Sequence, residues 1–325
     1  MTINRRHLLQ ALAAAPVAAA TLPAAANASA QASAIASAPS AFHRFKIGEA
    51  TVTALLDGHL PLGTQLIPDF DADKASSALK GTLYQFKDSS LQVPVNGYLV
   101  EHGGTYTLVD TGGTPQMSPA LGGLHSALAA AGVTPEQIST VVMTHLHPDH
   151  TGGLLLPDGS AAFANAELVV SEVEWGFWHD DAILAGVPKG SQGFFHAARM
   201  SVAPYKDRLK LIKGEAEAAP GLTAVPLPGH TPGHTGFMLD GGSESLLIWG
   251  DLVHMTALQF TYPDWTITFD TDAQQTATTR RQMMDRAVVD NLLVTGMHLD
   301  FPGLGQVKRA GEGYRYQAAP WQFGQ

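Results

Sequence analysis

The sequence predicts a layered α/β sandwich, in which helices cover the outer faces of packed β-sheets. Short runs rich in Val, Leu, Ile and Thr, each bounded by Gly, Asp or Pro, alternate with segments of helical periodicity. Many of these runs are continuously apolar, as expected for strands that are buried on both faces. No repeat or linker divides the mature chain, so we expect one domain over residues 45–325.

The elements of this domain follow from the same patterns. Strands are expected at residues 50–56, 98–100, 105–109, 140–143, 168–170, 222–225, 245–249 and 292–294. Leu121, Leu124 and Leu128 follow helical spacing, and Gly132 is a plausible end for that helix. Residues 273–291 form a second amphipathic helical pattern.

The first thirty residues have the composition of an export signal. Arg5 and Arg6 precede an Ala-rich apolar run over residues 8–20, and small residues follow up to Ala30. This pattern predicts a signal peptide over residues 1–30 of the twin-arginine type, and a periplasmic or secreted protein. The alternative is a membrane anchor, which Pro16 and the short run disfavour. Residues 31–44 are expected to form a flexible lead-in.

The composition excludes several classes of function. The chain has 325 residues and no cysteine, which rules out a thiolate catalyst, disulfides and cysteine-bound zinc, but it has 14 histidines. Losing residues 1–30 removes two arginines and no acid, which takes the net charge from −10 to −12. An acidic chain is not expected to bind nucleic acid. No other segment is long and apolar enough to span a membrane. The sequence is compatible with a homodimer.

Polar residues recur where the predicted strands end. Asp110 follows the strand at 105–109 and His145 follows the strand at 140–143. Asp251 comes just after residues 245–249, and His298 comes shortly after residues 292–294. We expect these side chains to converge on one rim of the sheets and to form a site.

The strongest local pattern is the run of residues 144–153, THLHPDHTGG. His145, His147, Asp149 and His150 cannot share one helix face, because Pro148 interrupts them and their spacing is irregular. A loop after a strand can instead aim alternate side chains in one direction. A cluster of surface histidines is the alternative, but unbalanced charges gathered at one strand end would be costly.

This H-x-H-x-D-H run followed by two glycines resembles the metallo-β-lactamase superfamily, whose αββα sandwich carries metals on one rim. Further motifs support the resemblance. Residues 109–112 resemble the motif whose aspartate, Asp110, orients the metal loop, and residues 229–234 resemble the next ligand loop, with His230 as ligand. Asp251 in Gly-Asp matches the bridging carboxylate, and His298 fills the last ligand position.

The resemblance implies two divalent metal ions, with zinc preferred and manganese, iron or cobalt as substitutes. The implied ligands are His145, His147, Asp149, His150, His230, Asp251 and His298. His234 is expected to be structural. The metal pair would lower the pKa of a bridging water, and the resulting hydroxide would attack an ester carbonyl. The chain is therefore expected to be a metal-dependent hydrolase.

A closer resemblance, over about residues 45–316, is to the methyl parathion hydrolases and their lactone- and ester-cleaving relatives. It implies an apolar pocket above the metals, with Trp178 and Phe194 as two aromatic walls. Met117 stands where a third aromatic is expected. His254 and Phe269 stand where the organophosphate-cleaving enzymes have leucines, which should make the pocket narrower and more polar.

These departures favour a small lactone or aryl ester as substrate, with organophosphate triesters second. Asp149, Asp251 and His254 are the candidate catalytic residues, and His254 is placed to contact the substrate or the leaving group. The alternatives are a dedicated organophosphate hydrolase, an acyl-homoserine lactonase, and a protein that binds metal or ligand without turnover.

Overall fold

The computed structural model describes residues 41–321. The predicted signal peptide and most of the predicted lead-in lie outside this range. The end of the lead-in was wrongly predicted, because strand β1 already begins at Phe42. Phe42 pairs with Leu55 of the next strand, and the neighbouring Phe45 and Ile47 are fully buried.

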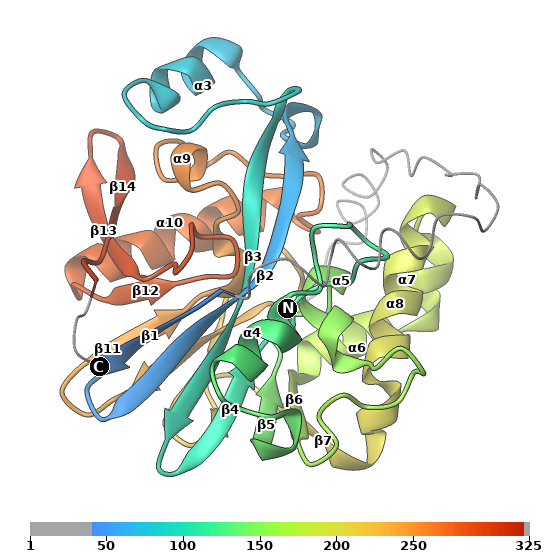
Figure 1. Ribbon diagram of the computed structural model, residues 1–325. Coiled ribbons are helices and arrows are strands. Elements are labelled where there is room, and N and C mark those ends of the chain that lie inside the picture. The colour runs from blue at the N-terminus through green and yellow to red at the C-terminus, as the bar shows by residue number, and fades with distance from the viewer. Residues whose placement is uncertain (1–40, 322–325) are drawn as a thin grey trace.

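Two seven-stranded sheets form the centre of the molecule (Figure 1). In each sheet the spatial order of the strands follows the chain. The first sheet contains β1 Phe42–Ile47, β2 Ala50–Gly63, β3 Ser90–His102, β4 Thr105–Val109, β5 Ile138–Val142, β6 Glu167–Ser171 and β7 Leu209–Ile212. The second contains β8 Glu217–Ala219, β9 Leu222–Pro226, β10 Thr235–Asp240, β11 Ser245–Ile248, β12 Leu293–Thr295, β13 Gly305–Ala310 and β14 Gly313–Ala318. Strands β4 to β7 run parallel, as do β11 and β12.

Helices cover both outer faces, so the αββα sandwich is confirmed (Figure 1). Those packed on the first sheet include α4 Leu124–Ala130, α6 Glu172–His179 and α8 Gln192–Val202, with α5 Pro148–Thr151 and α7 Asp181–Gly186 beside them. Helix α10 Ala273–Val289 covers the second sheet. The remaining helices are α3 Ala72–Leu79 and α9 Thr256–Gln259. Short 3-10 turns are η1 Thr64–Leu66, η2 Pro135–Gln137, η3 Gly152–Leu154, η4 Lys189–Ser191, η5 Ala203–Arg208 and η6 Gly250–Leu252.

The continuously apolar strands are buried on both faces, as predicted. In β5, Val141 packs against the outer helices, whereas Val142 faces the second sheet. In β11, Leu246 faces the first sheet and Leu247 packs toward α10. Each such aliphatic side chain contributes about 1.5–3 kcal/mol on burial. The rigid sandwich that results fixes the strand ends from which the site is built.

Strands β2 and β3 are much longer than predicted and extend past the first sheet as a two-stranded ribbon (Figure 1). The pairing shifts near Gly58, and beyond it Leu62 and Leu91 pack with Met255 and Trp265 in a separate apolar cluster. The prediction stopped early because Gly58 and Pro61 are usually strand-ending residues. The ribbon matters for function because it forms one wall of the cavity described below.

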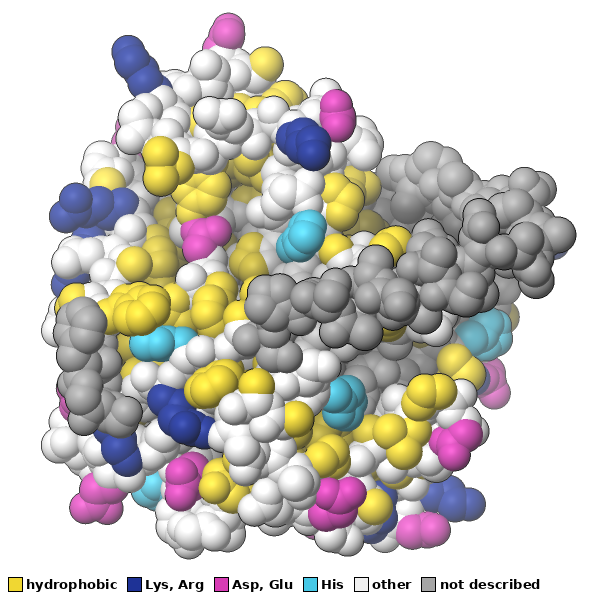
Figure 2. Space-filling view, viewed as in Figure 1, with side chains coloured by type: hydrophobic (Ala, Val, Ile, Leu, Met, Phe, Trp, Pro, Cys, Tyr) yellow, Lys and Arg dark blue, Asp and Glu magenta, His cyan; other side chains and the backbone are white. Residues whose placement is uncertain are grey.

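The surface carries charges of both signs. On the face in Figure 2, Lys and Arg side chains are spread out, with Asp and Glu side chains among them. Within residues 41–321, no helix combines the length and the apolar character that a bilayer crossing requires.

Candidate metal centre

The residues of the motif at 144–153 lie where the first sheet ends. His145 and His147 follow β5, with extended backbone at His147, and Pro148 then begins the single-turn helix α5, which carries Asp149 and His150. We predicted a loop without a helix here, because proline interrupts helices. Proline at the first helical position is well tolerated, since its missing N–H has no partner there in any helix.

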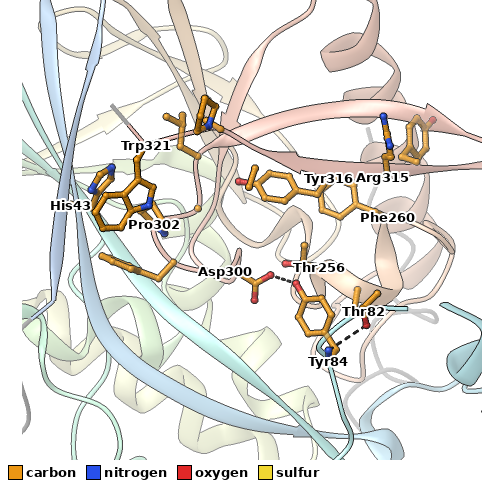
Figure 3. A pocket seen from close by; sticks show the side chains of 18 of the residues that line it. His43, Thr82, Tyr84, Thr256, Phe260, Asp300, Pro302, Arg315, Tyr316 and Trp321 are labelled. Atoms are coloured by element: carbon orange, nitrogen blue, oxygen red, sulfur yellow. Dashed lines mark hydrogen bonds between the residues drawn. The ribbon is translucent and has the colours of Figure 1, made fainter. Parts of the chain in front are cut away.

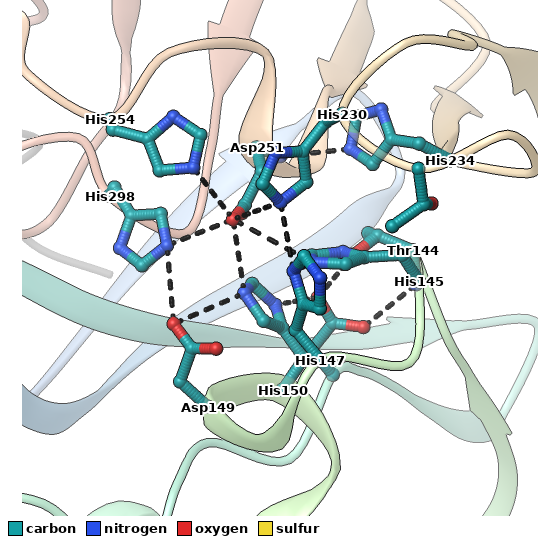
Figure 4. Close-up of polar contacts among 12 residues, drawn as sticks. Thr144, His145, His147, Asp149, His150, His230, His234, Asp251, His254 and His298 are labelled. Atoms are coloured by element: carbon teal, nitrogen blue, oxygen red, sulfur yellow. Dashed lines mark hydrogen bonds and ion pairs between the residues drawn. The ribbon is translucent and has the colours of Figure 1, made fainter. Parts of the chain in front are cut away.

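The remaining predicted ligands come from three loops of the second sheet. His230 lies between β9 and β10, Asp251 lies in η6 after β11, and His298 follows β12. All three are buried, and they meet the residues of the first motif at the same rim of the sandwich (Figure 4). The structure thus brings together all seven predicted ligands.

One group of ligand atoms consists of three imidazole nitrogens. His145 Nε2 lies 2.9 Å from His147 Nδ1, which lies 3.0 Å from His230 Nε2. Three nitrogens that converge in this way would supply three of the ligands that a zinc ion requires. We call His145, His147 and His230 the three-histidine group.

The second group is mixed. The Asp149 Oδ2 atom lies 3.6 Å from His150 Nε2 and 3.6 Å from His298 Nε2. Asp251 Oδ2 lies between the groups, 3.3 Å from His150 Nε2 and 3.1 Å from His298 Nε2. It is also 3.4 Å from His230 Nε2 and 3.7 Å from His145 Nε2. This oxygen is therefore placed to be shared by two ions. We call Asp149, His150 and His298 the mixed group.

The donor set fits two divalent ions. The buried His150 Nε2, which faces Asp149 and Asp251, and the buried Asp251 Oδ1 have no hydrogen-bond partner within residues 41–321. Burial and the neighbouring histidines hold the pKa values of His145 and His147 well below the usual range, which leaves neutral imidazoles that can bind a metal. Nitrogen and oxygen donors without sulfur suit zinc and similar ions.

Buried carboxylates and a carbonyl fix the orientation of the ligand rings. Asp110 adopts the left-handed region at φ 56°, and its carboxylate accepts hydrogen bonds from Thr144 N at 2.8 Å and His150 Nδ1 at 2.8 Å. His298 Nδ1 is 2.8 Å from the carbonyl of Pro94. Such contacts select the tautomer that presents Nε2 to the metal. The predicted orienting role of Asp110 therefore fits its geometry.

Asp270, which was not predicted as a site residue, plays the same part for the three-histidine group. Its Oδ1 lies 2.8 Å from His230 Nδ1, and its Oδ2 accepts a hydrogen bond from Ile267 N at 2.9 Å. The side chain is only 1% exposed. Asp270 stands 40 residues after His230 in no recognisable motif, so no local signal marked it.

Two further histidines touch the centre. Both ring nitrogens of His234 are engaged in hydrogen bonds to the backbone. Nδ1 is 2.9 Å from the Leu227 carbonyl, and Nε2 accepts the Asp251 N–H at 2.9 Å. This agrees with the prediction that His234 is structural. The Nε2 of His254 lies 3.0 Å from Asp251 Oδ2, and its ring stacks on His298. Burial lowers the pKa of His254 to about 4, although Asp251 opposes this shift.

An apolar cavity of about 210 Å³ ends on these ligands. Among the predicted pocket residues, Met117, Phe194, His254 and Phe269 line it. The other walls are aliphatic and come partly from the β2–β3 ribbon: Leu60, Pro61, Leu62, Leu66, Val93 and Ile267. This aliphatic wall was not predicted, because the outer parts of β2 and β3 were not recognised as strands.

Trp178 was wrongly placed among the cavity walls. Its ring lies behind His147, edge-on at 5.5 Å between ring centroids, and is only 3% exposed. The indole N–H donates a hydrogen bond of 2.6 Å to Glu174. Because this polar group needs a buried partner, the ring is turned into the core and away from the cavity.

A second cavity, of about 690 Å³, opens elsewhere on the molecule (Figure 3). Aromatic rings such as Phe260, Tyr316 and Trp321 line it, and within it the hydroxyl of Tyr84 donates a hydrogen bond to Asp300. Within residues 41–321, none of the clusters of metal-ligating side chains lies in its walls.

Comparison with known proteins agrees with this geometry. The model of the metallo-beta-lactamase superfamily matches residues 91–296, which is more than half of the chain. The chain therefore belongs to the metallo-beta-lactamase superfamily.

One curated protein and two solved structures illustrate which members of the superfamily this chain is similar to. An N-acyl homoserine lactonase of a Bacillus species is 27% identical over 113 residues, which is 35% of this chain and 37% of that protein. The chain thus matches little more than a third of this relative's length. The crystal structure of hydrolase AbOPH in the beta lactamase superfamily is 31% identical, with a TM-score of 0.82 over 88% of this chain and 99% of that one. AidC, a dizinc quorum-quenching lactonase with the product N-hexanoyl-L-homoserine, is 26% identical, with a TM-score of 0.79 over 87% and 99%.

Proposed function

We propose that this protein uses two zinc ions to hydrolyse a lactone or an aryl ester. Membership of the superfamily and the similarity to lactonases indicate a metal-dependent enzyme that acts on ester bonds. The observation that carries the substrate proposal is the convergence of two ligand groups at the end of a small apolar cavity.

The residues divide between the two ions as their distances suggest. The three-histidine group would hold one ion, the mixed group would hold the other, and Asp251 would contact both. When bound, such a pair supplies a water of lowered pKa as nucleophile and a Lewis acid for the ester carbonyl. Asp251 and Asp149 would be catalytic residues because they would hold the two ions beside the reacting atoms.

His254 is better placed to hold Asp251 than to contact a substrate carbonyl. Because its Nε2 faces the Asp251 carboxylate at 3.0 Å, Nε2 carries the single N–H of the neutral ring and donates it to Asp251. The remaining nitrogen, Nδ1, can then only accept a hydrogen bond. We therefore assign His254 a positioning role, together with a share in the cavity wall.

The cavity walls supply substrate selection. Phe194 and Phe269 meet edge-on, with ring centroids 6.2 Å apart, and leave a narrow space above the ligands. A volume of about 210 Å³ accommodates a flat ring or a short acyl chain more readily than a bulky triester. The apolar lining excludes water and strengthens the electrostatic interactions at the reacting carbonyl.

An acyl-homoserine lactone is the second candidate substrate. The lactonases named above act on or bind molecules of this class, and the aliphatic side chains Leu62, Val93 and Ile267 would pack well against an alkyl chain. A dedicated organophosphate hydrolase remains a third proposal, supported by the resemblance of the sequence to methyl parathion hydrolases.

One substrate panel on zinc-loaded protein tests these proposals. It contains an aryl lactone, an acyl-homoserine lactone, a phenyl ester, methyl parathion and a carbapenem. We expect the highest kcat/KM on a lactone or the phenyl ester, and loss of activity with a chelator. Higher kcat/KM on methyl parathion would overturn the preference. No turnover of any compound would favour a binding protein.

We also propose export by the twin-arginine route, on the evidence of residues 1–30 alone. Arg5→Lys together with Arg6→Lys should leave unprocessed precursor in the cytoplasm, measured by fractionation and immunoblotting. Normal processing of the double variant would point to the general secretion route instead.

A further inference from the structure

A buried carboxylate that belongs to none of the recognised motifs lies beside the metal centre. Glu174, in the first turn of α6, is fully buried and receives four hydrogen bonds. Its Oε1 accepts from Leu146 N at 2.9 Å and from Trp178 Nε1 at 2.6 Å. Its Oε2 accepts from Thr231 Oγ1 at 2.6 Å and from Gly233 N at 3.2 Å.

Three of these four donors lie in the two loops that carry the three-histidine group. Leu146 stands between His145 and His147, and Thr231 follows His230 directly. One oxygen of Glu174 therefore binds the first loop and the other binds the second. The two loops come from different sheets, and this carboxylate ties them together.

The backbone of the second loop also packs directly on α6. A Cβ atom added at Gly233 would lie only 2.0 Å from Glu174 N, so only glycine fits this contact. The position of His230 relative to α6 is thus fixed both by this close approach and by the carboxylate. Burial raises the pKa of the Glu174 carboxyl, while its hydrogen bonds stabilise the charged form and act in the opposite direction.

The mixed group is supported by other residues. His150 is oriented by Asp110, and His298 by the Pro94 carbonyl. None of the hydrogen bonds of Glu174 reaches Asp149, His150 or His298. A change at Glu174 should therefore affect the two halves of the centre unequally.

We infer that Glu174 is a positioning residue that sets the metal affinity of the three-histidine group and leaves that of the mixed group largely unchanged. This inference rests on the proposed metal centre. It concerns how the chain holds one ion, so metal binding can test it without any substrate.

Glu174→Gln is the principal variant. The two partners of Oε1 are N–H groups that can only donate, so the amide oxygen of glutamine must face them. The amide NH₂ then points at Gly233 N–H, and that hydrogen bond is replaced by a repulsive contact. We expect roughly a 10–100-fold weaker affinity for one of two zinc ions, the range seen when residues that support metal ligands are changed.

The measurement is zinc content after dialysis, together with competition against a chromophoric chelator. Wild type should retain two zinc ions per chain, and Glu174→Gln should lose one first. Thr231→Val removes a single hydrogen bond to Oε2 and should weaken the same ion by a smaller factor. This milder variant keeps the test valid if Glu174→Gln fails to fold.

Tyr205→Phe is the matched control. The Tyr205 hydroxyl donates to the Leu154 carbonyl and accepts from Phe163 N, so its loss also breaks buried hydrogen bonds, but in neither ligand loop. This control should keep both ions. If wild type binds two ions while the Glu174 and Thr231 variants lose neither or lose both equally, the inference is wrong. If wild type itself binds none, the proposed function fails instead.

Discussion

The two cavities of this protein differ in size and in the chemistry of their walls. The one of about 690 Å³ is lined by aromatic rings and contains the Tyr84–Asp300 hydrogen bond. The one of about 210 Å³ is apolar at its sides and ends on the ligand groups. Size alone would select the first as the binding site. The convergence of buried nitrogen and oxygen atoms selects the second, because among residues 41–321 candidate metal ligands line this cavity and not the other.

The largest effect should come from the shared ligand of the small cavity. Asp251→Ala removes the oxygen that lies 3.0–3.7 Å from five histidine nitrogens. We expect kcat/KM to fall by roughly 10²–10³ or more, comparable to the loss of a key electrostatic group at a reacting centre. Asp240→Ala, an exposed carboxylate at the end of β10, serves as control. Activity within about tenfold of wild type, or 1.4 kcal/mol of barrier, would exclude the shared role.

A smaller effect is expected from the walls of the same cavity. His254→Leu with Phe269→Leu should widen it and remove a hydrogen bond to Asp251. Lactone turnover should fall and methyl parathion turnover should rise, because the wider cavity holds a small ring less closely and admits the bulkier triester. The ratio of the two kcat/KM values should shift by about one to two orders of magnitude, since a pocket contact of about 1–3 kcal/mol is involved. Kinetics of the single and double variants on both substrates measure this ratio.

Two other outcomes would contradict the proposal that His254 and Phe269 select the substrate. Equal losses on both substrates, with reduced zinc content, would mean that these residues support the metals and do not select the substrate. An unchanged ratio with unchanged zinc content would remove the main structural argument for a small ester.

The sequence predicted the ligands better than the residues that support them. The ligands of the first motif stand within six consecutive residues, so a local pattern reveals them. Asp270 and Glu174 act on residues 40 and 28–59 positions away, and such contacts depend on how distant segments of the chain pack. Trp178 was misassigned because the burial of its partner Glu174, four residues earlier, itself depends on these distant contacts.

The strands, too, were predicted correctly only where a local pattern marks them. Strand β4 has the predicted bounds, because its apolar residues end at Asp110. Strands such as β14, with the sequence GYRYQA, were not predicted, because they carry polar side chains and lie at a sheet edge. The ribbon of β2 and β3 was only partly predicted, because its outer part is stabilised by contacts with α3 and α9 that come from distant sequence.

The smallest effects should come from the large cavity, where two tyrosines of β14 form a matched pair. Both line it, but the Tyr314 hydroxyl donates to Asp285, whereas the buried Tyr316 hydroxyl has no hydrogen-bond partner among residues 41–321. A buried hydroxyl without a partner costs about 1–3 kcal/mol, and a hydrogen bond to a charged group contributes about 1.5–3 kcal/mol. Tyr316→Phe should therefore leave the free energy of unfolding unchanged or raise it, while Tyr314→Phe should lower it.

Neither tyrosine change should alter kcat/KM on the preferred ester by more than about twofold, if the large cavity takes no part in the reaction; twofold corresponds to about 0.4 kcal/mol of barrier. Urea unfolding and steady-state kinetics on the two purified variants give both quantities. A clear loss of turnover in Tyr316→Phe with intact stability would show that the large cavity contributes to catalysis. The contrast between the two cavities would then have to be abandoned, since a wall without any metal-ligating cluster among the described residues would matter for the reaction as well.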